Sequence, residues 1–221
     1  MDKFLLWSRN RVITSFFSHI SESKGQEYIP QILNIKIRDT DPSMTFPAST
    51  NIDISKSNKK IFMQRLIPEY DLISCFYSLD LFFKNQKKTV SLFQFLDDYL
   101  INGGFFIGRL DDSSTLLQWF VDDNVVTKGT NKFIYRVSPD DSEFGKNYTH
   151  FQNEDKKIKY IANLDVLEKM GTERGLVFLG TYDLISIYKE YKNQNNKLSP
   201  SDEELSMLSK YFAFYKPIQP Q

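Results

Sequence analysis

The chain has 221 residues, 41% of them hydrophobic, with 28 basic and 28 acidic side chains, so it can bury a core without metals or disulfides. The single cysteine, Cys75, excludes an intramolecular disulfide, and two histidines are too few for a histidine-rich metal site. No segment approaches the ~20 apolar residues of a membrane helix. We therefore expect a cytoplasmic protein without cofactor or metal, with Cys75 buried and unreactive among its apolar neighbours.

The first third of the chain mixes helical and strand patterns. Apolar residues at helical spacing predict a helix over residues 2–21, and Ile32, Ile35 and Ile37 predict a strand. Residues 38–60 are rich in Asp, Asn, Ser and Pro, which is typical of a long irregular connection. A helix is expected over residues 69–85.

The central third is the clearest part of the pattern. Thr89 is the expected N-cap of a helix that stops at Asn102-Gly103-Gly104, with Gly103 as a left-handed residue. Three strand-like runs follow, over residues 105–110, 115–121 and 132–137. Because the connections between them are too short for a crossover helix, we expect antiparallel pairing. The predicted fold class is α+β, with an antiparallel sheet of four to six strands and packed helices.

The last third predicts a polar loop to about residue 153 and then mainly helices. Asn163 is a candidate cap for a short helix to Met170, a strand follows over residues 175–180, and a helix is expected over 181–191. Ser199 and Pro200 form a strong start for a helix over 200–212. We expect a single domain over 1–221, with a candidate N-terminal subdomain (1–88), an α+β core (89–194) and a C-terminal helix (199–213).

Charge is distributed unevenly along the chain. Residues 90–155 hold eleven acidic and five basic side chains, and six of the acids form adjacent pairs near strand ends. Each pair alone is typical of a turn, but together they predict an acidic face that would attract a basic partner. The candidate partner-binding residues are Asp111, Asp112, Asp122, Asp123, Asp140, Asp141 and Trp119.

Catalytic and metal-binding patterns are weak. The acidic pairs lack the alternating spacing of a calcium loop, and there is no glycine-rich phosphate loop and no Gly-x-Ser-x-Gly elbow. We therefore expect no catalytic residue. Arg109 and Arg136 either pair with the acids across the sheet or orient an anionic ligand, and His150, expected in a polar loop, is the remaining candidate base.

Nucleic-acid binding is not expected from the overall charge and composition of the chain. The sequence pI of about 6.7 is far from the basic range of nucleic-acid-binding domains. Aromatic residues make up 15% of the chain, but base stacking also needs basic residues interleaved with the rings. We therefore expect the aromatic residues to form the core.

The segment from Leu92 to Arg109, followed by Leu117-Gln118-Trp119-Phe120, resembles immunity proteins of bacterial polymorphic or contact-dependent toxin systems. In these proteins a helix ends in Gly-Gly, a strand follows, and a second strand carries a Leu-Gln-aromatic pattern. The resemblance implies a protein that binds and blocks a toxin, frequently a basic nuclease, through a charged face. No functional residue is carried over from it.

Three functions are therefore considered. The first is an immunity-type inhibitor that neutralises a cognate toxin through its acidic face and is not an enzyme. The second is an effector or anti-defence protein that acts by binding a host protein. The third is an unrecognised enzyme that uses His150 or Arg136 in a cleft.

Overall fold

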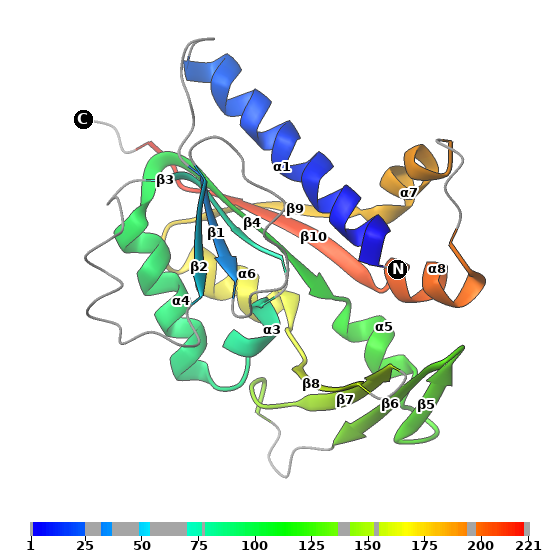
Figure 1. Cartoon of the computed structure of the whole chain (residues 1–221). Helices are drawn as coiled ribbons and strands as arrows, with labels where there is room; N and C mark the ends of the chain where they lie inside the picture. Colours follow the sequence, from blue (N-terminus) through cyan, green and yellow to red (C-terminus); the bar gives the residue numbers. More distant parts are fainter. Residues whose placement is uncertain are drawn as a thin grey trace.

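The computed structural model describes residues 2–24, 32–36, 49–53, 70–76, 78–136, 142–152, 155–193 and 198–218. These residues form two β-sheets with helices packed around them (Figure 1). The α+β class is confirmed, with an antiparallel sheet and packed helices. The larger sheet, which is mostly parallel, was not expected.

The main sheet has six strands in the order β2-β1-β3-β4-β10-β9. Four of them are parallel, namely β1 (Ile32–Lys36), β2 (Ser49–Asp53), β3 (Tyr70–Cys75) and β4 (Leu100–Asp111). The antiparallel strands β10 (Ser209–Tyr215) and β9 (Val177–Asp183) complete one edge. The central strand β3 is buried along its whole length because helices cover both faces of the sheet.

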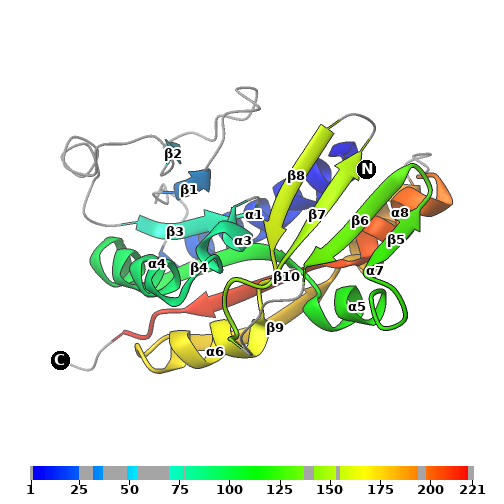
Figure 2. The same ribbon diagram turned by 90° about the horizontal axis from the view of Figure 1, so that it is seen from below.

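Two hydrophobic cores lie on opposite faces of the main sheet. On one face, α1 (Asp2–Lys24) and α7 (Leu184–Asn193) pack through Phe4, Ile13 and Tyr188 against strand residues such as Leu72 and Ile107. The other face is covered by α3 (Leu79–Phe82), α4 (Gln86–Tyr99) and α6 (Leu164–Thr172). Figure 2 shows this layer of helices along β3, β4 and β10.

The second sheet is antiparallel, with the order β5-β6-β7-β8. Its strands are β5 (Val125–Lys128), β6 (Asn131–Arg136), β7 (Asn147–Gln152) and β8 (Asp155–Tyr160). One face packs against α5 (Ser113–Gln118) and α8 (Pro200–Met207) through a third core that includes Phe120, Phe133 and Leu205. Because α5 directly follows β4 and α8 directly precedes β10, the second sheet adjoins one end of the main sheet (Figure 1).

Several predicted helix signals are confirmed. The Asn163 side chain caps α6 by accepting a hydrogen bond from the backbone of Asp165, and Ser199 caps α8 with Pro200 in its first turn. Other boundaries are wrong. Asn85, not Thr89, caps α4, and the helix ends at Tyr99. Gly103 has the expected positive φ of 85° but lies within β4.

Four predicted elements have a different structure. Residues 115–121 were expected to be a strand, but residues 113–118 are the helix α5. The expected helix over 69–85 contains β3, and the expected loop before residue 153 contains β7. The expected helix over 200–212 ends at Met207, where β10 follows. The buried run of β3 carries no periodicity that separates strand from helix. Within the irregular connection predicted over 38–60, residues 49–53 form the strand β2, and the rest of that segment lies outside the described residues. The division into subdomains stays a prediction.

No helix of the described ranges is both long enough and apolar enough to span a membrane.

The closest backbone approach inside the main sheet depends on Gly108 of β4. A Cβ atom there would lie 2.5 Å from Cζ of Phe212 and 2.6 Å from the carbonyl oxygen of Cys75, so Gly108→Ala should cost about 2 kcal/mol of unfolding free energy in urea denaturation. Phe212→Leu would relieve the contact with the Phe212 ring but would leave the contact with the carbonyl oxygen of Cys75. The double variant should therefore be less stable than Phe212→Leu alone, and equal stability of those two would contradict the packing.

Candidate functional site

A cluster of charged side chains lies where the two sheets meet, at the carboxyl end of β4. Its centre is Asp111, the last residue of β4, which pairs in register with Ser209 at the start of β10. Tyr148 of β7 and Lys159 of β8 are register partners in the second sheet, and both reach Asp111. In open parallel sheets, ligands bind at the carboxyl ends of the strands. The cluster lies at that edge.

Asp111 is held by four side chains. Its Oδ1 accepts hydrogen bonds from Nη2 of Arg109 at 3.1 Å and from Oγ of Ser209 at 3.3 Å. Its Oδ2 accepts from the Tyr148 hydroxyl at 2.8 Å and from Nζ of Lys159 at 3.0 Å. We call these five residues the Asp111 cluster. Both carboxylate oxygens are fully engaged, so Asp111 has little capacity left for a ligand.

The electrostatics of the cluster keep Asp111 ionised. Burial alone would raise its pKa, but Lys159 and Arg109 outweigh burial and hold the pKa of this carboxyl well below its usual range. Burial and the Asp111 charge together raise the pKa of Tyr148 well above its ordinary value. Tyr148 therefore stays protonated and acts as a donor to Asp111.

Asp80 of α3 is a second carboxyl beside this cluster. Burial, opposed by Lys159 and reinforced by the Asp111 charge, raises the pKa of Asp80 to about 6. Among the described residues no cation forms an ion pair with it, and the backbone N–H of Leu81 hydrogen-bonds its carboxyl. Asp80 is therefore the acid of this region whose oxygens have capacity for a ligand.

His150 is buried in the second sheet, not exposed in a loop as expected. It lies in β7, its ring stacks on Phe133 at a centroid distance of 4.6 Å, and its Nε2 lies 2.8 Å from Oδ1 of Asn131. Burial, with Lys159 and Lys157, lowers the pKa of His150 to about 4. A neutral, stacked imidazole with an occupied Nε2 orders the core of this sheet.

Cys75 is buried at the end of β3, and burial raises the pKa of its thiol far above the ordinary value. The prediction of an unreactive thiol is confirmed.

The structure separates the predicted partner-binding residues. Asp111 is in the cluster, and Asp112 pairs with Nζ of Lys210 at 2.8 Å and accepts hydrogen bonds from Ser114 and Thr115. Asp122 and Asp123 are exposed in the turn before β5. Asp140 and Asp141 lie outside the described residues. Because paired cations neutralise Asp111 and Asp112, these two acids add little negative charge to the predicted acidic face.

Trp119 follows α5 and packs edge-on against Phe133, with Nζ of Lys128 5.0 Å from its ring centroid. Whether Trp119 or the acids bind a partner stays a prediction. Arg109 pairs with Asp111 two residues along the same strand, not across the sheet as one of its two predicted roles states, whereas Arg136 is exposed on β6.

Four residues of the site were missed from the sequence, namely Asp80, Tyr148, Lys159 and Ser209, the last of which was expected in a helix. Asp80 stands in an otherwise apolar run from Leu79 to Phe83, and an acid in such a run is a usable signal. Tyr148 and Lys159 carried no signal, because their strands were expected to be a polar loop or were not predicted.

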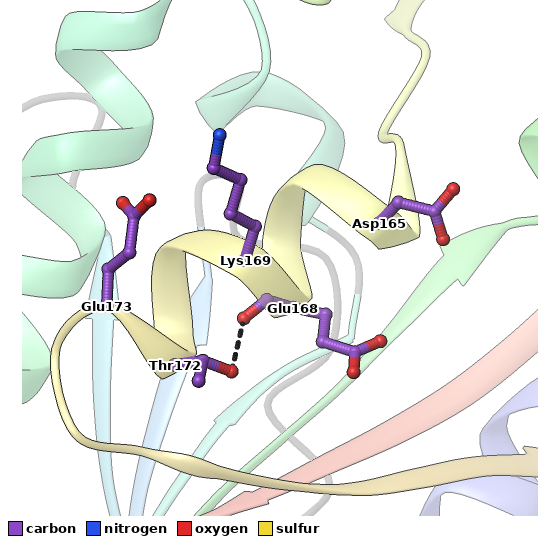
Figure 3. A pocket seen from close by; sticks show the side chains of 5 residues that line it. All are labelled: Asp165, Glu168, Lys169, Thr172 and Glu173. Atoms are coloured by element: carbon purple, nitrogen blue, oxygen red, sulfur yellow. Dashed lines mark hydrogen bonds between the residues drawn. The ribbon is translucent and has the colours of Figure 1, made fainter.

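A shallow surface depression lies elsewhere, on α6. It has a volume of about 380 Å³ and is lined by Asp165, Glu168, Lys169, Thr172 and Glu173. Figure 3 shows that all five side chains come from this helix and its last turn, where the Thr172 hydroxyl bonds the Glu168 carbonyl. A depression on a single helix has no converging groups from a second element. The described residues also contain no group of acids, histidines and cysteine that could hold a metal ion.

Removing the Asp111 carboxylate should destabilise the fold. Asp111→Ala leaves Arg109 and Lys159 without their shared anion, and breaking a buried ion network of this kind costs about 3 kcal/mol. Asp122→Asn, an exposed acid before β5, should change the unfolding free energy by less than about 0.5 kcal/mol. Equal effects of the two variants in urea denaturation would refute the structural role of Asp111.

Asp80 should make stability fall as pH rises. Its folded-state pKa of about 6 exceeds the ordinary value of 3.8, so the folded protein binds a proton more tightly than the unfolded chain between these values. The unfolding free energy should therefore decrease by roughly 2 kcal/mol between pH 4.5 and 7 through this group. Asp80→Asn should lack this component, and an unchanged pH slope in the variant would disprove the assignment.

Comparisons with known proteins assign the chain to a family. The family model described as the mRNA (guanine-N(7))-methyltransferase domain matches residues 36–209, more than half of the chain. No curated protein sequence matches the chain significantly. The chain is similar to the solved structure of an S-adenosylmethionine-dependent methyltransferase from Clostridium acetobutylicum (14% identity, 92% of each chain covered, TM-score 0.49).

Two further solved structures give similar values. A putative S-adenosylmethionine-dependent methyltransferase from Listeria monocytogenes has 12% identity, with 92% of this chain and 87% of that chain covered and a TM-score of 0.49. The glycopeptide N-methyltransferase MtfA complexed with S-adenosylmethionine has 10% identity, 91% and 87% coverage and a TM-score of 0.47. These identities and TM-scores are too low to support an argument about function.

The family match corrects the expected function. The resemblance to immunity proteins was wrong, as was the expectation of a toxin inhibitor that is not an enzyme, because the matched family consists of methyltransferase domains. The third alternative, an unrecognised enzyme, agrees better with the match. The chain belongs to the mRNA (guanine-N7)-methyltransferase domain family.

Proposed function

We propose that the protein methylates N7 of a guanine in mRNA, with S-adenosylmethionine as methyl donor. The observation that carries this proposal is the family match, which spans residues 36–209 and so includes every residue of the Asp111 cluster as well as Asp80. A cytoplasmic location remains part of the proposal and is supported by the single buried thiol of Cys75.

The sheet topology gives the donor a place to bind. In the strand order β2-β1-β3-β4, the chain adds β2 on one side of β1 and then adds β3 on the other side. Ligands of such sheets bind outside the carboxyl ends of the strands at the point where this change of side occurs. β2 ends at Asp53, and an acid at the end of the second strand is the group that bonds ribose hydroxyls in such sheets. The end of β2 is therefore the place that we propose for the adenosine part of the donor.

The chain departs from the usual pattern at the turn after β1. Nucleotide-binding turns of this type use glycine for close backbone approach, but no glycine lies between Gly25 and Gly103. Any contact there has to come from other residues. S-adenosylmethionine, when bound, supplies a methyl group activated by a positively charged sulfur.

Asp80 supplies the chemistry that a guanine acceptor needs. N7 of guanine carries a free lone pair at neutral pH, so its methylation requires no general base and leaves a positive charge on the ring. A carboxylate that is ionised above its pKa of about 6 stabilises such a charge and accepts hydrogen bonds from N1–H and the exocyclic amine. Arg109 and Lys159, held by Asp111, keep the surroundings of this carboxyl rigid.

Donor binding and methyl transfer test the proposal separately. Calorimetry should detect S-adenosylmethionine binding that weakens in Asp53→Ala, and transfer of labelled methyl to a guanosine-capped RNA should fall roughly 100-fold in Asp80→Asn. Asp98→Asn, an exposed acid on α4, is the matched control and should retain full activity. A wild-type protein that binds no S-adenosylmethionine and transfers no methyl group would refute the proposed function.

A further inference from the structure

The second sheet has one covered face and one face that the described helices leave open. On the covered face, Phe133 lies opposite His150 and Tyr135 lies opposite Tyr148 in the register, and these side chains pack towards α5 and α8. Figures 1 and 2 show α5 on one side of β5 to β8 only. Since neighbouring residues of a strand point to opposite faces, the alternate residues form the other face.

The register arranges this other face, which we call the outer face, in rows across the strands. One row holds Val125, Ile134, Thr149 and Ile158 side by side. Val125 and Ile158 on the two edge strands are 38% and 47% exposed, whereas Thr149 on the central strand β7 is buried. The next row places Phe151 of β7 between Lys132 of β6 and Lys156 of β8. Both lysines are exposed and Phe151 is partly exposed.

Among the residues of β5 to β8, the outer face carries positive charge and no acid. Alternation assigns to it the bases Lys132, Arg136 and Lys156, and none of the residues of β5 to β8 on this face is acidic. Asp155, the acid within β8, alternates to the opposite side. Lys132 and Lys156 flank the Phe151 strand with a backbone separation of roughly 10 Å.

We propose that the outer face binds single-stranded RNA, as the part of the mRNA that extends beyond the methylated guanine. This proposal rests on the proposed function, which supplies an RNA substrate. Aromatic rings exposed on a sheet stack on unpaired bases, and lysines beside the ring contact the phosphates. The row Lys132–Phe151–Lys156 is this combination of a stacking surface and two phosphate contacts.

An anionic partner suits this face better than a second copy of the chain. A two-fold dimer through the outer face would place the same patch on both subunits, so that Lys132, Arg136 and Lys156 would face like charges. RNA instead brings one negative charge for each nucleotide.

Fluorescence anisotropy with an uncapped, fluorescein-labelled single-stranded RNA of about ten nucleotides tests the face. The double variant Lys132→Gln/Lys156→Gln should bind roughly tenfold more weakly, and the slope of log affinity against log salt should fall by about 1.4. Lys169→Gln/Lys189→Gln removes the same charge from exposed positions on α6 and α7 and should bind as the wild type does. Equal affinities and salt slopes of the two double variants would overturn the proposal.

Phe151 tests the stacking contact in the same assay. Phe151→Ala should weaken RNA binding roughly tenfold, whereas Phe151→Tyr, which keeps an aromatic face, should restore it. An RNA affinity that does not depend on the residue at position 151 would contradict stacking. A monomer–dimer shift in sedimentation caused by these variants, without any loss of RNA binding, would identify a second copy as the occupant and overturn the proposal.

The uncapped RNA separates this inference from the proposed function, because its binding requires neither donor nor methyl transfer. Loss of RNA binding in the outer-face variants of a protein that methylates no guanine would support the face and refute the activity. Full methylation of guanosine-capped RNA, with outer-face variants that bind RNA normally, would support the activity and refute the face.

Discussion

The ion cluster around Asp111 is the interaction on which the arrangement of the two sheets depends. Asp111 belongs to the main sheet through β4, whereas Tyr148 and Lys159, which bond it, belong to the second sheet. The chain crosses between the sheets at the same place, where the backbone N–H of Asp112 bonds the Leu208 carbonyl at 2.7 Å. A single carboxylate thus joins β4, β7, β8 and β10, and its charge is needed to hold two cations at a partly buried junction.

The Asp111 junction assigns different roles to two neighbouring acids. Asp111 is saturated with donors, so its pKa is depressed and its oxygens are occupied by the protein itself. Asp80 shares the same cations at longer range and lacks an ion pair of its own among the described residues, so burial dominates and its pKa rises to about 6. The saturated acid provides rigidity, and the unsaturated acid retains the capacity to bind a ligand. The proposed role of this edge therefore rests on the unequal distribution of two positive charges between two carboxylates.

Local signals were predictable from the sequence, and signals that depend on long-range pairing were not. The caps at Asn163 and Ser199 were found because capping chemistry involves only neighbouring residues. The strand β3 was read as a helix because six consecutive buried residues between parallel strands show no alternation. Asp80 was detectable as an acid in an apolar run. Lys159 was not, because its role exists only when β8 pairs with β7 and reaches Asp111, 48 residues away in the chain.

The same limitation applies to the charge of the chain. A formal charge of zero and a sequence pI near 6.7 average over groups that the fold treats differently. Asp111 and Asp112 of the acid-rich segment are neutralised by Arg109, Lys159 and Lys210. The lysines on either side of Phe151 form no such ion pair within the described part of the chain, and alternation along β8 places Asp155 on the opposite face. The electrostatic potential at each surface depends on the charges that remain after ion pairing. A segment rich in acids can therefore present basic side chains on its outer face.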